Sequence, residues 1–147
     1  MKYIFISLIT AILDQGTKAA AKKKLPVGKK KHVKGNFYLW HTKNTGLAYN
    51  KFKESRKIVL SATWAAVGII FTYLCYLIKR EAPAADKVGA ALLLGGGVGN
   101  LIDRIKDKEV TDFMYIDIQE IKNMPIFNFA DVAAATGALI TIVRALL

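Results

Sequence analysis

Hydrophobic positions along the chain cluster into four long blocks separated by polar segments. The cleanest block, residues 58–78, reads "IVLSATWAAVGIIFTYLCYLI" and runs for 21 residues without a charge. A helix needs about 20 apolar residues to cross the hydrocarbon core of a bilayer. A buried helix in so small a soluble protein would rarely be apolar on every face. This block therefore predicts a transmembrane helix.

Three further blocks are long enough to cross a membrane, but each is interrupted by an ionisable side chain. They span about 3–21, 88–104 and 125–143. Ionisable groups within membrane helices are rare, and they usually face the interior of a helix bundle or a polar cavity. We therefore expect an all-α membrane protein with four transmembrane helices, forming a single domain over residues 1–147.

The first block also fits a second interpretation, a cleaved secretory signal. A basic start is followed by 11 apolar residues and later by three alanines at 19–21, which resemble a small-residue cleavage site. Asp14, Gln15 and Lys18 interrupt the approach to that site. We therefore favour a transmembrane helix.

Composition adds charge to this picture. The net charge is +11, and 13 of the 22 lysines and arginines lie between Lys18 and Lys57. Because this segment connects two membrane spans, we expect Lys22–Lys34 to attract anionic lipid headgroups, and we expect no nucleic-acid partner. Within it, "GNFYLWHTKNTG" (35–46) mixes strand-forming aromatic residues with turn residues. It predicts a small extramembrane β-sheet cradle between helices 1 and 2.

Cysteine and histidine usage excludes several kinds of site. Cys75 is the only cysteine, so neither an intrachain disulfide nor a cysteine-based metal site can form. His32 and His41 both lie in the basic segment without a nearby acidic cluster, which argues against zinc. We expect no metal and no cofactor, and the sequence offers no Ser-His-Asp or Cys-His set.

The order of the spans places the unusual polar residues on one side of the membrane. With four spans, the end of helix 1, the end of helix 3 and the start of helix 4 share one face. Pairs spaced by three or four residues, such as Asn100 and Arg104, also share one side of their helix. The sequence therefore predicts one polar site at this face, built from Asp14, Lys18, Asn44, Asn100, Asp103, Arg104, Asp112, Asn128 and Asp131.

Glycines precede this polar group on helix 3, at 95–97 and at 99. Gly95 and Gly99 form a small-xxx-small pair, which lets membrane helices approach closely. The segment does not match a nucleotide-binding loop, because no Lys-Ser/Thr follows it and no strand precedes it.

Paired carboxylates suggest one kind of chemistry for such a site. Two aspartates in contact hold a single proton at neutral pH, because like charges repel. The ionised partner can then take a proton from water while the protonated partner donates to a carbonyl oxygen, which hydrolyses an amide without a metal. The candidates are Asp14, Asp103, Asp112 and Asp131. Asp112 and Asp131 stand on either side of one loop and can meet across the mouth of the bundle.

Two non-catalytic interpretations of the same residues stay open at this point. The charged groups could form interhelical ion pairs, with Asp103 joining a salt bridge beside Arg104. They could also relay protons in a small proton-coupled carrier. Residue spacing does not separate these possibilities from hydrolysis.

Five motifs in order resemble one known family across essentially the whole chain. They are "DQGTK" (14–18), "NTGLAYN" (44–50), "GGGVGNLIDR" (95–104), "VTDF" (110–113) and "FNFAD" (127–131). Together they resemble the motifs of lipoprotein signal peptidase, the type II signal peptidase of bacteria.

The resemblance implies a fold, an activity and roles for residues. It implies an aspartyl endopeptidase that removes the signal peptide from diacylglyceryl-modified prolipoproteins, cutting before the lipidated cysteine. It implies that Asp112 and Asp131 are the catalytic pair, and that Asp103 stabilises the fold. By the same resemblance, the residues that support the pair or bind substrate are Asp14, Lys18, Asn44, Gly46, Asn100, Arg104 and Asn128.

The resemblance also implies a location, the bacterial cytoplasmic (inner) membrane with the site toward the outer face, and we expect a monomer. That orientation conflicts with the distribution of charge. It places 17 of the 22 basic residues outside and only Lys2, Lys79, Arg80, Lys87 and Arg144 inside. The positive-inside rule predicts the opposite orientation. We expect the orientation that the motifs imply.

Overall fold

The computed structural model describes residues 1–46, 55–118, 121 and 124–146 of the chain. Its helices are α1 (Lys2–Lys24), α2 (Arg56–Lys79), α3 (Ala84–Lys106) and α4 (Phe129–Leu146). All four are long and apolar enough to cross a membrane. A 23-residue helix is about 34 Å long, slightly more than the hydrocarbon core of roughly 30 Å. The expected four-helix membrane fold is confirmed.

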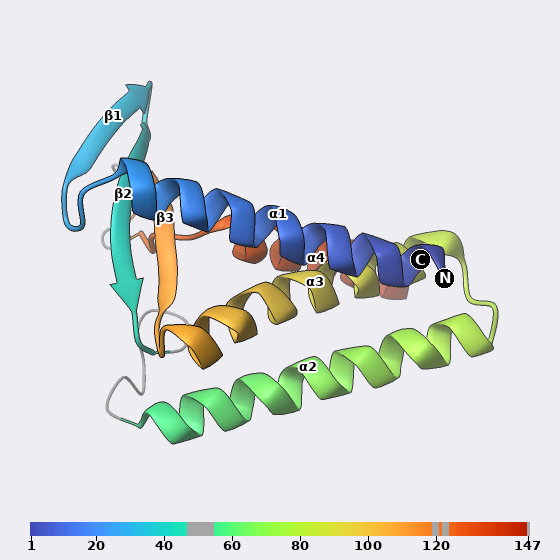
Figure 1. Ribbon diagram of the computed structural model, residues 1–147. Helices are drawn as coiled ribbons and strands as arrows, with labels where there is room; N and C mark the ends of the chain where they lie inside the picture. Colours follow the sequence, from blue (N-terminus) through green and yellow to red (C-terminus); the bar gives the residue numbers. More distant parts are fainter. Residues whose placement is uncertain (47–54, 119–120, 122–123, 147) are drawn as a thin grey trace.

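Helix α3 lies at the centre of the bundle and packs against α1, α2 and α4 (Figure 1). Its small residues make this possible. A methyl group at Gly95 would lie 2.6 Å from Thr10 Cβ and 2.7 Å from the carbonyl oxygen of Ser7 on α1. A methyl group at Gly96 would overlap the carbonyl oxygen of Ala130 on α4. The glycines therefore let α3 touch two neighbours at backbone distance.

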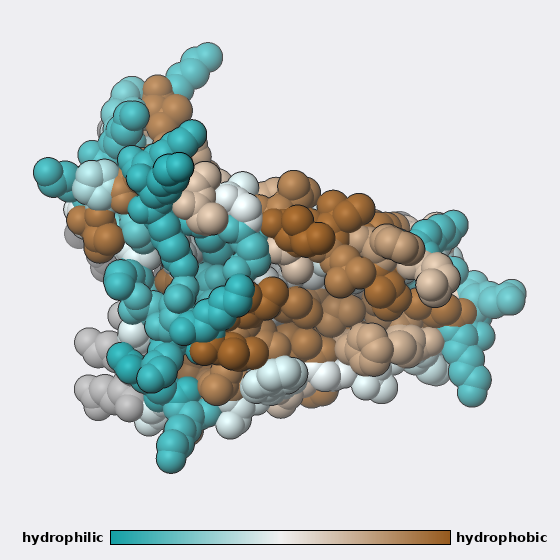
Figure 2. All heavy atoms as spheres, viewed as in Figure 1, coloured by the Kyte–Doolittle hydropathy of each residue, from teal (hydrophilic) through white to brown (hydrophobic). Residues whose placement is uncertain are grey.

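Apolar side chains cover the outside of the helices, as expected for a protein whose solvent is lipid. Figure 2 shows an apolar belt over the helices between two hydrophilic ends. On α2, Ile69 and Phe71 are 70% and 50% exposed, and Cys75 is also exposed. The buried apolar cluster lies away from the sheet, between α1, α2 and α3, and consists of Tyr3, Leu74, Leu77, Ala82, Ala90, Ala91 and Leu94.

A three-stranded antiparallel sheet lies at the end of the bundle where α1 and α3 finish (Figure 1). Its strands, in order across the sheet, are β1 (Lys30–Lys34), β2 (Phe37–Asn44) and β3 (Val110–Ile116). The expected cradle between the first two helices is thus present. Its third strand comes from the connection between α3 and α4, and β3 places Asp112 directly opposite Thr42 of β2.

Helix α4 begins at Phe129, later than the expected start near residue 125. The pairing of Phe127 with Met114 of β3 explains this later start. Phe127 is held extended against Met114, with N–H···O distances of 2.9 Å and 2.8 Å in the two directions. Asn128 therefore precedes the first turn of α4 instead of lying inside the helix, a position that determines its role below.

Candidate active site

Polar side chains from α1, α3, β3 and the start of α4 gather where the sheet meets the helices. Five charged or amide side chains among them are almost fully enclosed, with exposed fractions of 0–3%: Asp14, Lys18, Asp103, Asp112 and Asn128. Buried polar groups are costly unless each is paired or hydrogen-bonded. The contacts of this cluster satisfy that requirement and connect all four elements.

Lys18 on α1 is the cation of the cluster. Its ammonium lies 2.7 Å from Asp14 Oδ2, 3.3 Å from Asp103 Oδ2 and 2.8 Å from Asn100 Oδ1. An ammonium has three protons to donate, and these three acceptors match that number. Lys18 therefore neutralises carboxylates of α1 and α3 together and fixes these helices against each other.

The two carboxylates bound to Lys18 also organise the backbone of neighbouring elements. Asp14 Oδ1 accepts a hydrogen bond from the backbone N–H of Ala130 at 2.9 Å, in the first turn of α4. Asp103 Oδ2 accepts one from the backbone N–H of Thr111 at 3.0 Å, at the start of β3. The ion pairs thus anchor the two segments that carry Asp131 and Asp112.

Asn128 and Asp131 form a reciprocal cap at the start of α4. The N–H of Asp131 donates to Asn128 Oδ1, and the N–H of Asn128 donates to Asp131 Oδ2, both at 3.0 Å. This is a capping-box arrangement, in which two otherwise unpaired helix N–H groups are satisfied. It orients the carboxylate of Asp131 through the backbone of its own helix.

The side-chain amide of Asn128 extends this cap to the second aspartate. Asn128 Nδ2 donates to Asp112 Oδ1 at 2.7 Å and to Asn100 Oδ1 at 3.1 Å. Asn100 Nδ2 donates in turn to Asp131 Oδ1 at 2.9 Å. Asp112 and Asp131 are therefore joined through shared asparagines, although they come from a strand and a helix.

The remaining oxygen of Asp112 faces the end of β2. Asn44 Nδ2 donates to Asp112 Oδ2 at 3.1 Å, and the N–H of Gly46 donates to Asn44 Oδ1 at 3.0 Å. Arg104 closes this side of the site, since its Nη2 donates to the carbonyl oxygen of Gly46 at 3.0 Å. Its Nη1 donates to the carbonyl oxygen of Asn100 at 3.3 Å.

Burial raises the pKa of Asp112 from 3.8 to about 7, and the nearby charge of Asp131 adds to the effect. The hydrogen bonds from Asn44 and Asn128 oppose the shift but do not cancel it. Among the described residues, neither Asp112 nor Asp131 has a basic nitrogen within 4 Å. A carboxyl group in this position holds its proton up to neutral pH.

From the sequence, Asp103 is expected to belong to a structural salt bridge, and in the structure it pairs with Lys18 of α1. Consecutive residues of a helix point in directions about 100° apart, so Asp103 faces α1 while Arg104 reaches the carbonyl oxygen of Gly46. The motif residues 47–50, including Leu47 and Tyr49, lie outside the described part of the chain.

Within residues 1–46, 55–118, 121 and 124–146, no three side chains of His, Cys, Asp or Glu are grouped so as to hold a metal ion. His41 is buried on β2, where its Nδ1 lies 3.0 Å from the carbonyl oxygen of Leu25. The described side chains therefore offer carboxyl, amide and ammonium groups for chemistry.

A family model described as "Signal peptidase (SPase) II" matches residues 6–147. The chain belongs to the signal peptidase II family. Among curated relatives, a lipoprotein signal peptidase of Clostridium tetani is 34% identical over 141 residues, covering 95% of this chain and 89% of the relative. One of Fusobacterium nucleatum is 34% identical over 145 residues, covering 98% and 86%.

Solved structures agree with this membership of the signal peptidase II family. A bacterial membrane enzyme solved by the in meso method at 2.3 Å resolution superimposes with a TM-score of 0.84 at 27% identity, covering 99% of this chain and 87% of that one. A second, solved at 1.9 Å resolution, gives 0.81 at 30% identity, covering 99% and 92%. The arrangement of helices and sheet is therefore shared along the whole chain.

The structure adds Gln15 to the residues of this candidate site. Gln15 Nε2 donates to Asp103 Oδ1 at 2.8 Å and to the carbonyl oxygen of Gly99 at 3.1 Å. The sequence did carry a signal, since Gln15 stands inside the "DQGTK" motif. Its role depends on where α3 lies against α1, and residue spacing gives no indication of that.

Proposed function

We propose that the chain is an aspartyl endopeptidase that removes the signal peptide from diacylglyceryl-modified prolipoproteins, cutting before the lipidated cysteine. The observation that carries the proposal is the hydrogen bonding of Asn128 to Asp112 at 2.7 Å and to Asp131 at 3.0 Å. It brings two carboxyl groups together at one end of the helices. The relatives named lipoprotein signal peptidase support the substrate class.

Of the four candidate aspartates, two form ion pairs with a buried lysine. Asp14 and Asp103 pair with Lys18 and anchor backbone N–H groups. Asp112 and Asp131 have no cationic partner within 4 Å among the described residues, so their protons can move. We therefore assign catalysis to Asp112 and Asp131, and a supporting role to the other two.

The proposed mechanism divides the work between the pair. Asp112, with a pKa of about 7, keeps a proton and donates it to the carbonyl oxygen of the scissile peptide bond. Asp131 lies in the first turn of α4, where helix N–H groups favour a carboxylate, and it takes a proton from the attacking water. The hydroxyl of that water adds to the carbonyl carbon. The tetrahedral species then collapses as Asp131 gives its proton to the leaving amine and Asp112 takes one back from the hydroxyl, which restores the starting state of the pair.

The surrounding residues keep this pair in place. Asn100 and Asn128 hold the carboxyl groups, while Asn44 and Gly46 form the edge of the site at the end of β2. Arg104 ties Gly46 to α3. We propose that substrate backbone and the lipid-bearing cysteine enter between this edge and α4.

The interior of the bundle disfavours the proton-carrier alternative. The buried cluster at the end away from the sheet is made of Tyr3, leucines and alanines, as given above. A carrier would need ionisable or hydrated groups through the full thickness of the membrane. The buried carboxylates and the buried lysine of the described residues lie at the sheet end only.

The protein is proposed to reside in the bacterial cytoplasmic (inner) membrane with the sheet toward the outer face. Strand β1 is fully exposed and carries Lys30, Lys31 and Lys34, which suits contact with anionic headgroups. We also propose that it acts as a monomer and binds no nucleic acid. The lipidated substrate then reaches the site from within the bilayer.

A cleavage assay tests the proposal. Purified protein is mixed in detergent with a synthetic prolipoprotein, with and without the diacylglyceryl group, and cleavage is followed by mass spectrometry. We expect cleavage of the lipidated form alone, and loss of at least about 10³-fold in rate for Asp112→Asn or Asp131→Asn.

Asp107→Asn is the matched control, because it removes an exposed carboxylate that pairs with Lys22 near the same interface. It should cleave at the wild-type rate. Near-normal cleavage by Asp112→Asn or Asp131→Asn, with the variant folded, would show that the assigned pair is wrong.

A further inference from the structure

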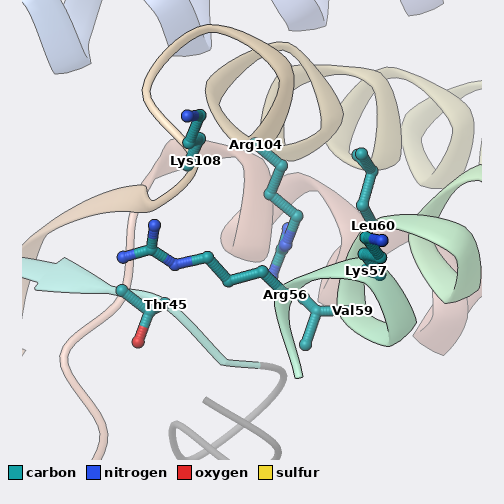
Figure 3. Close-up of a pocket in the computed structure, with 7 residues that line it drawn as sticks. All are labelled: Thr45, Arg56, Lys57, Val59, Leu60, Arg104 and Lys108. Atoms are coloured by element: carbon teal, nitrogen blue, oxygen red, sulfur yellow. The ribbon is translucent and has the colours of Figure 1, made fainter. Parts of the chain in front are cut away.

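A hollow of about 330 Å³ opens beside the candidate active site, between the start of α2 and the end of α3 (Figure 3). Four basic side chains line it: Arg56 and Lys57 from α2, Arg104 from α3, and Lys108 from the turn that follows α3. Val59 and Leu60 form its apolar wall. Thr45, which stands between Asn44 and Gly46 of the candidate active site, completes the lining, and Arg104 belongs to that site as well.

The four basic side chains of this pocket have no carboxylate within 4 Å among the described residues, and only Arg104 feels aspartates at longer range. The ion pairs in the described part of the chain involve Lys18, Lys22, Lys30, Lys43 and Arg144, none of which lines the pocket. Basic side chains gathered in a concave surface raise the local positive potential and attract anions. The pocket therefore favours an anionic ligand.

The position of Arg56 and Lys57 strengthens this preference. They are the first two residues of α2, and the first turn of this helix contains no acidic residue. A helix N-terminus already carries a partial positive charge and normally attracts acidic side chains. The charges of Arg56 and Lys57 add to the partial positive charge of the helix N-terminus and repel it. A bound anion would neutralise both the side-chain charges and the helix terminus.

Lys108 reaches the pocket from an unusual backbone conformation. Its φ is +61°, in the left-handed region where glycine or asparagine usually follows a helix. A lysine at this position bears a conformational cost that glycine would avoid. The lysine side chain in exchange adds a fourth positive charge to the lining.

The apolar wall determines what kind of anion fits. The uncharged run of α2 begins at Ile58, directly after the two basic residues, and the partly exposed Leu60 faces the pocket, with the buried Val59 behind it. A ligand in this pocket therefore meets cations at the membrane surface and apolar side chains immediately below. A free inorganic anion would use only the upper half of the pocket.

We propose that this pocket binds an anionic phospholipid, with its phosphodiester among Arg56, Lys57, Arg104 and Lys108 and an acyl chain leaving past Leu60 along the apolar surface of α2. The proposed peptidase substrate does not account for the charges, since a diacylglyceryl group carries no phosphate. The inference is independent of the aspartyl mechanism, because it concerns lipid binding and not hydrolysis.

Arg104 connects this pocket with the candidate active site. The same guanidinium that lines the pocket donates to the carbonyl oxygens of Gly46 and Asn100. Asn100 in turn holds Asp131. A phosphodiester on the open side of Arg104 would therefore fix the orientation of a residue that supports the site.

Lipid binding to the purified full chain tests this proposal without any cleavage assay. Native mass spectrometry compares phosphatidylglycerol with phosphatidylcholine of identical acyl chains, and a parallel titration adds inorganic phosphate as competitor. We expect one phosphatidylglycerol to bind at least tenfold more tightly than phosphatidylcholine. Phosphate at millimolar concentration should leave it bound, because phosphate gains nothing from the apolar wall.

The pocket variant Arg56→Gln, Lys57→Gln, Lys108→Gly keeps Arg104 and removes three charges. Each removed charge should weaken phosphatidylglycerol binding about fivefold, so the triple variant should lose roughly 100-fold. Lys108→Gly alone suits the left-handed backbone and should remain folded while losing about fivefold. The matched control, Lys79→Gln, Arg80→Gln, Lys87→Gln, removes three charges at the opposite end of the helices and should bind as wild type.

Three results would overturn the proposal. Equal affinity of the wild type for the two lipids would show that charge plays no part. Release of the lipid by millimolar phosphate would make the pocket a site for a free anion. Full phosphatidylglycerol binding by the pocket variant, with loss in Lys30→Gln, Lys31→Gln, Lys34→Gln, would place the lipid on β1.

Discussion

Asn128 and Asp131 hydrogen-bond each other in both directions at the start of α4, each N–H donating to the side chain of the other at 3.0 Å. The same Asn128 donates its side-chain amide to Asp112 at 2.7 Å. One asparagine thus begins a helix and spaces two carboxyl groups. In the proposed mechanism, the geometry of the pair depends on a helix cap.

Substitution of Asn128 separates these two roles. Asn128→Ser keeps an oxygen that can cap α4 but loses the amide that reaches Asp112, whereas Asn128→Ala loses both. We expect both variants to cleave a lipidated precursor at least about 100-fold more slowly, because the carboxyl groups lose their spacing. The serine variant should be more stable than the alanine variant by about 1 kcal/mol. Rates within a few-fold of wild type for Asn128→Ser would mean that the cap alone matters.

Lys18 and Lys22 provide a matched pair on one helix. Lys18 is buried between two aspartates, while Lys22 pairs with Asp107 at the surface, where both side chains are about two-fifths exposed. Lys18→Met should destabilise the protein by about 3–5 kcal/mol, since it leaves buried carboxylates without their cation. Lys22→Met should cost less than about 1 kcal/mol. Thermal unfolding in detergent measures both, and similar losses for the two variants would contradict the assigned role of Lys18.

The raised pKa of Asp112 predicts how stability changes with pH. The folded state holds this proton up to about pH 7, whereas the unfolded chain releases it near 3.8. The folded state therefore binds more protons between these values, and its stability falls as the pH rises through them. Each pKa unit is worth about 1.4 kcal/mol, so the loss is on the order of a few kcal/mol.

Unfolding midpoints of wild type and Asp112→Asn between pH 4 and 8 check this prediction. As the pH rises, the unfolding midpoint of wild type should fall relative to that of Asp112→Asn. The difference between the two midpoints should stop changing above pH 7. Parallel profiles would show that Asp112 titrates in the same range when folded and unfolded.

Two glycines are expected to respond to alanine in opposite directions. A methyl group at Gly99 would overlap the carboxylate of Asp14, whereas one at Gly68 on α2 meets no atom within 4 Å. Gly99→Ala should destabilise the protein by about 1–3 kcal/mol and displace the ion-pair cluster. Gly68→Ala should stabilise it by about 0.5–1 kcal/mol, because alanine favours the helix. Equal shifts in unfolding midpoint would contradict the close contact of α1 and α3.

Orientation in the membrane is tested by labelling single cysteines in a Cys75→Ala background. Lys30→Cys on β1 should react with a membrane-impermeant maleimide in intact cells with a permeable outer layer. Lys79→Cys, at the opposite end of α2, should react only after lysis. The reverse pattern would show that the positive-inside rule, and not the site, determines the topology.

The sequence by itself determined the four spans and the face on which the polar residues meet. Membrane spans can be predicted from local hydropathy alone. The order of the four spans along the chain then determines which helix ends lie on the same side of the membrane. The motifs could likewise be placed on this face before any contact was known. What hydropathy could not place was the start of α4, because the extended pairing of Phe127 with Met114 is a contact between distant residues.

Only the tertiary structure decided how the four aspartates divide. Sequence spacing treats Asp14, Asp103, Asp112 and Asp131 alike, but in three dimensions Lys18 pairs with the first two, and Asn128 hydrogen-bonds the other two. The reason is the packing of α1 on α3. Gly95 and Gly99 let these helices come close enough for the ammonium of Lys18 to reach the carboxylates of both Asp14 and Asp103. Charge neutralisation depends on distances between helices, and no pattern within one helix contains them.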